Sequence, residues 1–476
     1  MRHFHTADEV RAAEAPLLAR LPEYAAMRRA AHGLATVVAR ELRARTGGVV
    51  GRRVLVLAGS GDNGGDALFA GAELRRRGVA VEALLLRPDR AHPAALAAFR
   101  AATGRVVTRA GDPDLVIDGI VGLSARGSLR PDAAAIVDGL TAPVVAADLP
   151  SGVDPDTGAV DGPAVRAAVT VAFGAYKPVH VLASAWCGEL HLIDIGLVPD
   201  AATITSPDDG EVGRAWPVPG PADDKYSQGV TGIMAGSEKY PGAGVLCTGA
   251  AVAATSGMVR YVGQGGAEVV HHYPEVVTAR SVDEAGRVQA WVVGPGFGTD
   301  DDAADRLRSV LESDVPVLVD ADGLTVLSRR PELVRGRSSA TVLTPHAGEF
   351  ERLTGSAPGP DRVRSVRALA ADWNVTVLLK GRATVIADPD GAVSVDDAGS
   401  SWSSTAGSGD VLSGMIGALL AAGVPARTAA VMGARAHSRA AALAATDRGR
   451  RTAAPISASP LLRAVADAVG DLRAQA

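Results

Sequence analysis

Cysteine is almost absent from this chain of 476 residues, which contains only Cys187 and Cys247. Two thiols cannot build the disulfide framework of a small secreted protein, so the sequence favours a reducing compartment. The N-terminal residues also lack the apolar core of a signal peptide. The longest apolar stretches, such as Val411 to Val424, contain glycines and fall short of the roughly 20 residues of a membrane span. These absences predict a soluble, cytoplasmic protein that does not bind a membrane.

No excess of one charge marks the chain either, because 48 basic residues face 53 acidic ones and the net charge is only −5. Without a basic stripe or tail, binding to nucleic acid regardless of its sequence is excluded. The apolar share of 47% and the charged share of 21% are ordinary for globular proteins. The length allows two or three domains of about 150 residues each.

Short apolar runs alternate with helical patterns in both halves of the chain. Strands interrupted by helices predict parallel sheets that are covered on both faces. Expected strands of the first half are 53–58, 79–86, 115–117, 143–147, 168–173 and 190–195, with helices at 67–77 and 93–102. Those of the second half are 230–235, 290–293, 316–320, 341–343 and 375–379, with a hairpin at 384–387 and 393–395 and helices at 244–258, 410–422 and 429–444.

Proline, glycine and aspartate crowd the segment between Val198 and Ser227, as is typical of a linker between domains. We therefore expect two α/β domains in tandem. The first spans residues 1–210, the linker 211–224, and the second domain residues 225–476.

Two short glycine-rich turns each end in an aspartate and open onto an apolar helix. The first runs from Gly59 to Asp66 and the second from Gly407 to Asp410. Glycines let backbone amides approach a ligand closely, and a helix N-terminus adds partial positive charge. The two turns differ in design and predict two anion-binding sites in one polypeptide.

Three polar loops of the first half follow predicted strands. Asp62 to Asp66 follows one strand, Asp118 and Gly119 end another, and Asp148 to Asp154 follows a third. In open parallel sheets, ligands bind at the carboxyl ends of the strands, so these loops are expected to converge on one crevice. A single glycine turn would equally suit a purely structural role.

Three strings of the first half are typical of a known family: GSGDNGGDA, DGIVG, and AADLPSGVDPDTG followed by VAFGAYKPVH. Nearly all of residues 1–200 resemble the YjeF N-terminal domain family, the NAD(P)H-hydrate epimerases. The resemblance implies a Rossmann-like three-layer α/β/α fold and the interconversion of R and S hydrates of NADH and NADPH, called NADHX and NADPHX. It implies substrate contacts by Asp62, Asn63, Gly64, Gly65 and Asp66, and by Gly122, Leu123, Ser124, Ala125, Arg126, Gly127 and Ser128.

The resemblance also implies a catalytic carboxylate and a metal site. Asp148 matches the aspartate that contacts substrate, and a carboxylate suits the proton transfer needed to open and reclose the hydrate. Asn63, Asp118 and Ser151 match positions that hold a potassium ion, which prefers oxygen ligands.

Two positions depart from this family pattern: Asp62 stands where Asn is usual, and Ala67 where Gly is usual. An extra carboxylate beside a substrate that carries a pyrophosphate is unfavourable unless potassium offsets it. These positions keep a second interpretation open, in which the first half is a nucleotide-binding or partner-docking module without turnover.

The second turn combines small residues at a helix start with the carboxylate of Asp410. Backbone amides there would stabilise charge on a transferred phosphoryl group while Asp410 accepts a hydroxyl proton. A plain helix cap by Ser404 or Ser408 explains the same residues structurally. Asp320 and Asp322, at another strand end, suit either a magnesium ion held through waters or a helix cap.

The strings around these residues, with KYSQG at 225–229 and GPGFG at 294–298, resemble the NAD(P)H-hydrate dehydratase family, a ribokinase-like branch. The resemblance runs from about Lys225 to the last helix. It implies hydrate contacts by Ala243, Gly298, His346 and Asp410, and contacts to the adenine nucleotide by Lys380, Gly381, Arg382, Ala383, Thr384 and Gly409. Ser408, Phe297 and Ala347 stand where Thr, Leu and Pro are usual, and none of these changes removes a needed functional group.

Together the resemblances predict a bifunctional enzyme that repairs NADHX and NADPHX, with ADP and Mg²⁺ at the second site and K⁺ at the first. Bacterial family members use ADP and leave AMP, a preference that the sequence itself does not distinguish from ATP. The two resemblances also imply a homo-oligomer, with a tetramer as one form. A small-molecule kinase for a sugar or vitamin precursor is the alternative for the second half, since such a kinase shares the same turn.

Overall fold

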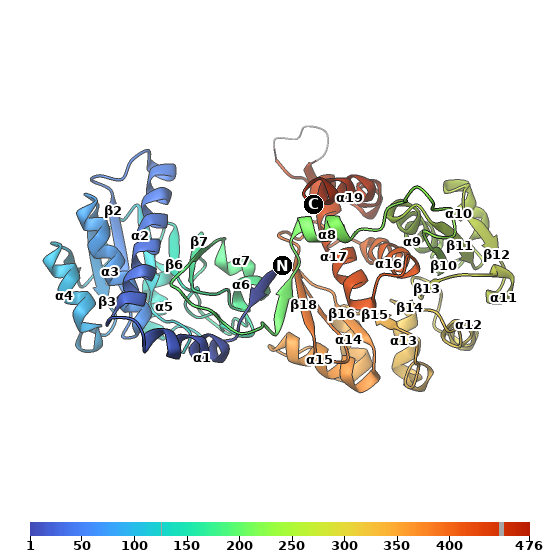
Figure 1. Ribbon diagram of the computed structural model, residues 1–476, viewed down its shortest axis with the longest axis horizontal. Coiled ribbons are helices and arrows are strands. Elements are labelled where there is room, and N and C mark those ends of the chain that lie inside the picture. Colours follow the sequence, from blue (N-terminus) through green and yellow to red (C-terminus); the bar gives the residue numbers. More distant parts are fainter. Residues whose placement is uncertain (125, 447–451) are drawn as a thin grey trace. The chain divides into compact units, whose positions relative to one another are not determined.

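The computed structural model describes residues 1–124, 126–446 and 452–476, which form two compact units (Figure 1). One unit is His3–Ile204, and the other is Thr205–Ala476 together with Met1–Arg2. Each contains its own sheet, so the expectation of two α/β domains in tandem is confirmed.

The N-terminal unit is built on a seven-stranded sheet in the order β4-β3-β2-β5-β6-β7-β8, in which every neighbouring pair is parallel. Its strands are β2 (Arg53–Ala58), β3 (Ala80–Leu85), β4 (Arg105–Val107), β5 (Leu115–Gly119), β6 (Val144–Ala147), β7 (Val169–Phe173) and β8 (Glu189–Ile193). Its helices are α1 (Ala7–Leu18), α2 (Ala25–Thr46), α3 (Asp62–Arg76), α4 (Pro93–Ala101), α5 (Pro131–Asp138), α6 (Val179–Leu182) and α7 (Ser184–Cys187).

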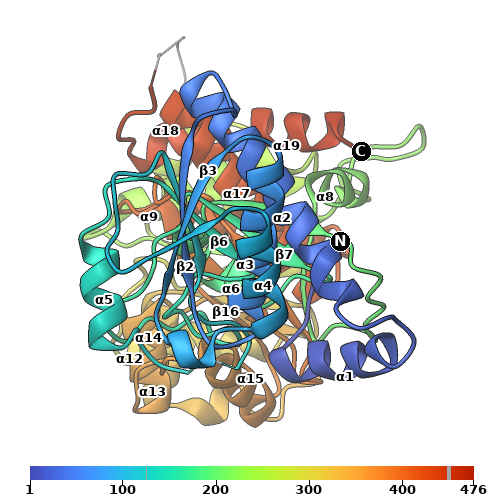
Figure 2. The same cartoon turned by 90° about the vertical axis from the view of Figure 1, so that its left-hand side faces the viewer.

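Apolar side chains of β2 alternate between the two faces of this sheet, as the period of a strand requires. Val54 and Val56 pack in the core that contains residues of α2, α3 and α4. Leu55 and Leu57 pack in the core on the other face, with Ala133 of α5. Figure 2 shows α2, α3 and α4 along one side of β2 and β3 and α5 along the other. The three-layer prediction for this unit is confirmed.

The C-terminal unit contains an eleven-stranded sheet in the order β1-β9-β18-β17-β16-β15-β14-β13-β10-β11-β12. The strands from β12 to β16 are parallel, and β16, β17 and β18 are antiparallel, which includes the predicted hairpin. The strands are β1 (Arg2–Phe4), β9 (Ile204–Ser206), β10 (Val230–Met234), β11 (Met258–Val262), β12 (Val277–Ala279), β13 (Ala290–Val293), β14 (Val317–Val319), β15 (Thr341–Leu343), β16 (Thr376–Leu379), β17 (Ala383–Ala387) and β18 (Val393–Asp397).

Helices α9 and α16 lie close together over this sheet because small residues separate them. A Cβ on Gly414 would lie 2.1 Å from the carbonyl oxygen of Cys247, and one on Gly417 would lie 2.1 Å from Val292 Cγ2. The helices of this unit are α8 (Asp209–Ala215), α9 (Pro241–Ala254), α10 (Gly266–His272), α11 (Val282–Ala285), α12 (Asp301–Leu311), α13 (Asp322–Arg329), α14 (Ala347–Thr354), α15 (Arg362–Trp373), α16 (Ser408–Ala421), α17 (Ala426–Thr446), α18 (Ala458–Arg463) and α19 (Val465–Ala474).

Both sheets contain a point at which the strand order reverses: between β2 and β5 in the first, and between β10 and β13 in the second. Crevices at such points, beside the carboxyl ends of the strands, are the usual ligand sites of open α/β sheets. Both glycine-rich turns lie at this end of their sheets.

The structure corrects three expectations about element boundaries. The predicted linker at 211–224 is partly helical, because Val212 of α8 and Trp216 are buried in the core of the C-terminal unit. Helix α3 begins at Asp62 and not at Ala67, so Asp62 to Asp66 are helical. The helix expected to reach Met258 ends at Ala254, and Met258 begins the unpredicted strand β11.

Candidate functional site

A cavity of about 660 Å³ opens in the N-terminal unit at the carboxyl ends of its strands. Residues of α1 and α2 line one side of it, and the first turns of α3 and the loops after β5 and β6 line the other. The predicted site residues that line it are Asp62, Asn63, Asp66, Gly122, Leu123, Ser124 and Asp148.

Five other residues of the two predicted substrate segments are not among the residues that line the cavity. Gly64 packs against the preceding loop, where a Cβ would lie 2.3 Å from the carbonyl oxygen of Gly59. Gly65 faces the ring of His92, and Arg126 forms ion pairs with Asp156 and Asp154. The remaining two are Gly127 and Ser128. Ala125 lies outside the described residues.

Asp148 is held by an ion pair that the sequence analysis did not identify. Its Oδ1 accepts hydrogen bonds from Lys177 Nζ at 2.5 Å and from the Phe173 amide at 3.0 Å. Lys177 is fully buried, and its ammonium group also donates to the Phe173 carbonyl at 2.9 Å. Among the described residues, Asp148 Oδ2 has no hydrogen-bond partner, so this oxygen of a cavity-lining side chain is the one left for a ligand.

The backbone at Asp148 adopts a left-handed conformation, with φ of +67°. Such a conformation costs a residue with a side chain about 1–3 kcal/mol and persists only where its surroundings impose it. His180 is one of those surroundings, because its Nε2 donates to the Asp148 carbonyl at 2.8 Å while its Nδ1 accepts from the Lys177 amide at 2.9 Å. Burial lowers the pKa of His180 to about 4, so the ring is neutral as this bonding requires.

Four further carboxyl groups line the cavity: Glu14 of α1, Glu23 between α1 and α2, and Asp62 and Asp66 of α3. Asp66 is buried, and burial together with the neighbouring carboxylates of Asp148 and Asp62 raises its pKa well above the usual range. Burial also raises the pKa of Glu14. The cavity therefore combines one ion-paired carboxylate, Asp148, with two carboxyl groups, Asp66 and Glu14, whose pKa is raised by burial.

Asn63, Asp118 and Ser151, the predicted potassium ligands, meet below this cavity. Ser151 donates through its amide and its hydroxyl to Asp118, at 2.9 and 2.7 Å, and its Oγ accepts from the Val121 amide. Asn63 Nδ2 donates to the carbonyls of Val121 and Ala147, which leaves its Oδ1 as a free acceptor.

The buried carboxyl group of Asp118 tests whether a cation fits there. Asp118 has no exposed surface, and burial raises its pKa although hydrogen bonds from Ser151 and from the Ile120 amide oppose the shift. No cationic side chain among the described residues pairs with it. A buried carboxylate without a counter-ion is costly. Its neighbours offer amide and hydroxyl oxygens, so the residues fit a monovalent cation with oxygen ligands.

Lys177, His180 and Glu14 are the site residues that the sequence analysis missed. Lys177 and His180 lie within the quoted string VAFGAYKPVH, and lysine is scarce beside arginine in this chain. The scarcity of lysine was the feature that could have indicated Lys177 as a site residue. No sequence feature indicated Glu14, because nothing in a helix before the first strand of the sheet shows that it covers the cavity.

Three strand ends converge in the C-terminal unit around the start of α16. Asp320 follows β14, Thr344 to His346 follow β15, and Lys380 follows β16. Lys380 Nζ lies 2.8 Å from Asp320 Oδ1 and 3.6 Å from Glu349 Oε2. Although burial alone would lower it, these two carboxylates raise the pKa of Lys380.

Asp410 lies in the first turn of α16, next to this ion pair. Among the described residues it has no hydrogen-bond or ion-pair partner. Burial raises its pKa to about 7, and the carboxylate of Asp320 adds to the shift while Lys380 opposes it. A carboxyl group with a pKa near 7 at a helix N-terminus can accept a proton at neutral pH, as a general base must.

The other residues predicted to contact the hydrate or the adenine nucleotide lie at several places in this unit. A Cβ on Gly409 would lie 3.5 Å from Lys380 Nζ, so Gly409 adjoins the ion pair. The Gly298 amide donates to Asp322 Oδ2 at 3.0 Å, and the Ala243 side chain faces Gly296. Gly381, Arg382, Ala383 and Thr384 lead from Lys380 into β17.

His346 is more exposed than a substrate-enclosing histidine, with 57% of its side chain accessible. Its Nδ1 accepts from the amides of Gly348 and Glu349 and so caps α14. Its Nε2 lies 3.5 Å from Glu349 Oε1 and has an open side. The structure therefore shows the capping role directly and leaves Nε2 for a ligand.

Only one of the two aspartates considered for magnesium keeps a free oxygen. Asp320 accepts from Lys380 at Oδ1 and from Ser413 at Oδ2, each at 2.8 Å, so both of its oxygens are used within the protein. Asp322 accepts only at Oδ2, which fits a metal held through Oδ1 or through water. In the described ranges, no three His, Cys, Asp or Glu side chains lie close enough to form a metal cluster.

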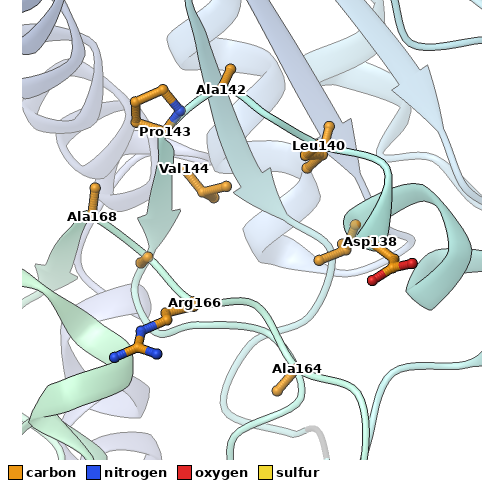
Figure 3. Close-up of a pocket in the computed structure, with 10 residues that line it drawn as sticks. Asp138, Leu140, Ala142, Pro143, Val144, Ala164, Arg166 and Ala168 are labelled. Carbon is orange, nitrogen blue, oxygen red and sulfur yellow. The ribbon is translucent and has the colours of Figure 1, made fainter.

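A second cavity of about 520 Å³ lies at the opposite ends of the N-terminal strands (Figure 3). Its lining is mostly apolar, with Asp138 and Arg166 as its charged residues. It contains none of the predicted site residues. Across the part of the chain that the structure describes, no helix is long and apolar enough to cross a membrane.

Comparisons with known proteins match both units. Residues 23–179 match the family model described as YjeF-related protein N-terminus, and residues 231–462 match the model described as NAD(P)H-hydrate dehydratase. The chain is 61% identical over 434 residues to the bifunctional NAD(P)H-hydrate repair enzyme Nnr of Mycobacterium tuberculosis, covering 90% of this chain and 91% of that one. It is 57% identical over 476 residues to the enzyme of the same name from Mycobacterium leprae, covering 99% and 100%.

A solved structure resembles the C-terminal unit. It is the ADP/ATP-dependent NAD(P)H-hydrate dehydratase of Bacillus subtilis, co-crystallised with ATP and Mg²⁺. The two chains are 25% identical with a TM-score of 0.51, and the match covers 56% of this chain and 98% of that one. The ribokinase-like expectation for this unit is thereby confirmed.

Proposed function

Because this chain belongs to the family of bifunctional NAD(P)H-hydrate repair enzymes, we propose that its two sites act in turn on one damaged nucleotide. The N-terminal unit interconverts the R and S forms of NADHX and NADPHX. The C-terminal unit dehydrates the S form with ADP and gives NADH or NADPH, AMP and phosphate. The observation that carries the proposal is Asp410 at the start of α16, a carboxyl group with a pKa of about 7 that is unpaired among the described residues.

Dehydration needs a better leaving group than hydroxide. Asp410 accepts the proton of the ring hydroxyl, whose oxygen attacks the terminal phosphoryl group of ADP and releases AMP. The lone pair of the ring nitrogen then expels phosphate, and loss of a neighbouring ring proton restores the dihydropyridine. Amides at the start of α16 stabilise charge on the transferred phosphoryl group, because they point toward the helix N-terminus.

Lys380 balances the charge of the same site. Its ammonium group lies among the carboxylates of Asp320 and Glu349 and lowers the pKa of Asp410 relative to burial alone. We assign Ala243, Gly298 and His346 to the hydrate, and Lys380 to Thr384 with Gly409 to the adenine nucleotide. Mg²⁺ enters with ADP, and Asp322 is the carboxylate that fits it.

At the N-terminal site, Asp148 is the proposed acid–base group, since its free Oδ2 belongs to a cavity-lining carboxylate. Asn63, Asp118 and Ser151 would hold K⁺, which supplies positive charge beside a substrate that carries a pyrophosphate. A homo-oligomeric assembly and a cytoplasmic location are further proposals that rest on the family and its substrates.

The test uses mixed R and S NADHX with ADP and Mg²⁺ and follows the absorbance of restored NADH. Full recovery is expected from the unaltered chain. Asp410→Asn should abolish dehydration and spare epimerisation, whereas Asp148→Asn should stop recovery once the S form is consumed. Asp305→Asn, an exposed carboxylate of α12, is the matched control and should behave as the unaltered chain.

Two results would contradict the proposal. Near-normal dehydration by Asp410→Asn would remove Asp410 as the base. No recovery of NADH together with a stable phosphate ester on another substrate would show a small-molecule kinase instead.

A further inference from the structure

Asp66 lines the N-terminal cavity but takes part in no ion pair or hydrogen bond within the described residues. Only 6% of the residue is exposed, and its Oδ1 is a buried oxygen without a partner. Leaving a buried carboxyl oxygen unsatisfied is unfavourable, so such a group in a native fold calls for an explanation. Because Asp66 lines the cavity, a ligand there lies next to this carboxyl group.

Asp66 and Asp148 face the same cavity from different elements, and their surroundings are opposite. Asp148, at the end of β6, receives hydrogen bonds from Lys177 Nζ and from the Phe173 amide. Asp66, in the second turn of α3, receives none. Two carboxyl groups in one site whose environments favour opposite protonation states are the usual arrangement of an acid and a base.

Neither of the other two carboxyl groups near Asp148 matches this description. Asp62 is exposed to solvent, and Glu14 is only partly buried. Burial, with Asp148, Asp62 and Glu14 adding and Lys177 opposing, raises the pKa of Asp66 well above its ordinary value. Asp66 is therefore the buried carboxyl group of this cavity whose surroundings favour the protonated form.

We propose that Asp66 is the second catalytic residue of the N-terminal site and works as proton donor opposite the base Asp148. This inference rests on the epimerase activity proposed above. The ring-nitrogen lone pair forms a C=N bond as the C–O bond breaks, and the hydroxyl leaves as water with the proton of Asp66. Water then adds to the other face of that carbon, its proton passes to Asp148, and the C=N electrons return to nitrogen.

One proton has then moved from Asp66 to Asp148, and the reverse reaction uses the two groups with their roles exchanged. Return of the proton to Asp66 between turnovers restores the ion pair between Lys177 and Asp148. Epimerisation requires that Asp66 and Asp148 together hold one proton.

The test follows conversion of pure R-NADHX by the full chain, coupled to its own dehydratase with excess ADP and Mg²⁺. Asp66→Asn keeps the size of the side chain but cannot supply a carboxyl proton. We expect kcat for the R form to fall by about 100- to 10,000-fold with KM nearly unchanged. Dehydration of pure S-NADHX should be unaffected, and so should both reactions in Glu73→Gln, the control on the outer part of α3.

A kcat within about threefold of the unaltered chain, or a loss confined to KM, would overturn the proposal and leave Asp66 as a binding residue. Failure of the unaltered chain to convert the R form would instead refute the epimerase activity. Calorimetric binding of R-NADHX without ADP shows that the N-terminal unit of Asp66→Asn is folded.

The pH profile of the reaction tests the proposal independently of Asp66→Asn. Because the donor must be protonated, kcat for the R form should fall as pH rises above the pKa of Asp66. Removing the carboxylate of Glu14 in Glu14→Gln should move this alkaline fall to lower pH, since that carboxylate raises the pKa of Asp66. A flat alkaline limb, or one that Glu14→Gln leaves in place, would overturn the proposal.

Discussion

Each unit pairs a lysine with a buried aspartate at the carboxyl end of its sheet, but the two ion pairs have different roles. In the N-terminal unit, Lys177 is fully buried and lies 2.5 Å from Asp148, the proposed catalytic group itself. In the C-terminal unit, Lys380 is 21% exposed and lies 2.8 Å from Asp320, while the proposed base Asp410 stands beside the pair without a partner.

The difference shows two ways in which neighbouring groups influence the protonation state of a carboxyl group at the end of a sheet. Direct pairing with an ammonium group favours the ionised carboxylate. Burial beside a pair whose charges nearly cancel raises the pKa of the unpaired carboxyl group instead, to about 7 for Asp410. The first arrangement gives the carboxylate a cationic partner, and the second leaves an acid–base group ready to change its charge near neutral pH.

The largest difference between the two ion pairs is expected in the free energy of unfolding when each lysine is removed in turn. Lys177→Met leaves Asp148 as a buried carboxylate without its counter-ion, which we expect to lower the free energy of unfolding by about 3–5 kcal/mol. Lys380→Met should cost less, about 1–3 kcal/mol, because the partly exposed site admits water and Asp320 keeps its bond from Ser413. Urea unfolding of both variants measures the difference.

Equal losses in the two variants would show that the two pairs are energetically alike. The double variant Lys177→Met with Asp148→Asn is the control, because it removes the uncompensated charge and should recover part of the lost stability. Arg335→Ala, at an exposed ion pair with Asp372, should change stability by no more than about 1 kcal/mol.

A second, smaller effect concerns pH. Dehydration of pure S-NADHX should rise as pH increases through about 7, because Asp410 accepts a proton only when ionised. Lys380 lowers the pKa of Asp410, so Lys380→Met should move this rise to higher pH. Initial rates at saturating substrate measure both, and Asp148→Asn should show the profile of the unaltered chain.

The same raised pKa affects stability with a definite sign. The folded chain holds the proton of Asp410 more tightly than the unfolded chain does, so the stabilisation is complete below the ordinary pKa of 3.8 and is lost as pH rises through about 7. Asp410→Asn should remove this part of the pH dependence of stability.

A dehydration profile that is flat between pH 5 and 8 would contradict the assignment of Asp410.

The smallest effect is expected at His346, which both caps α14 and was predicted to contact the hydrate. His346→Asn retains a side chain that caps helices well, so stability should change by less than about 0.5 kcal/mol. If Nε2 contacts the hydrate, KM should rise severalfold while kcat changes little. His346→Ala should lose the cap as well, at about 1 kcal/mol, and an unchanged KM in both variants would leave capping as the only role.

Much of the fold was predictable because strand periodicity depends on nearby residues. The limits of β13 and β15 were predicted to the residue. The loops that carry Asp62, Asp118, Asp148 and Asp320 were placed at the ends of expected parallel strands, and Lys380 was placed in the segment that joins two apolar strands. The start of α3 was wrong because glycines signal a turn, whereas packing against the Gly59 loop allows helix to begin at Asp62.

The sequence by itself determined the two-unit plan, the family resemblance and the identity of the residues at the strand ends, including the aspartates of both glycine-rich turns. Only the tertiary structure decided which aspartate is paired, which is buried alone and which is exposed. Lys177 reaches Asp148 from 29 residues away, and Lys380 reaches Asp320 from 60 residues away. Because the pKa of a carboxyl group depends on such neighbours and on burial, its chemical role is set where distant segments meet.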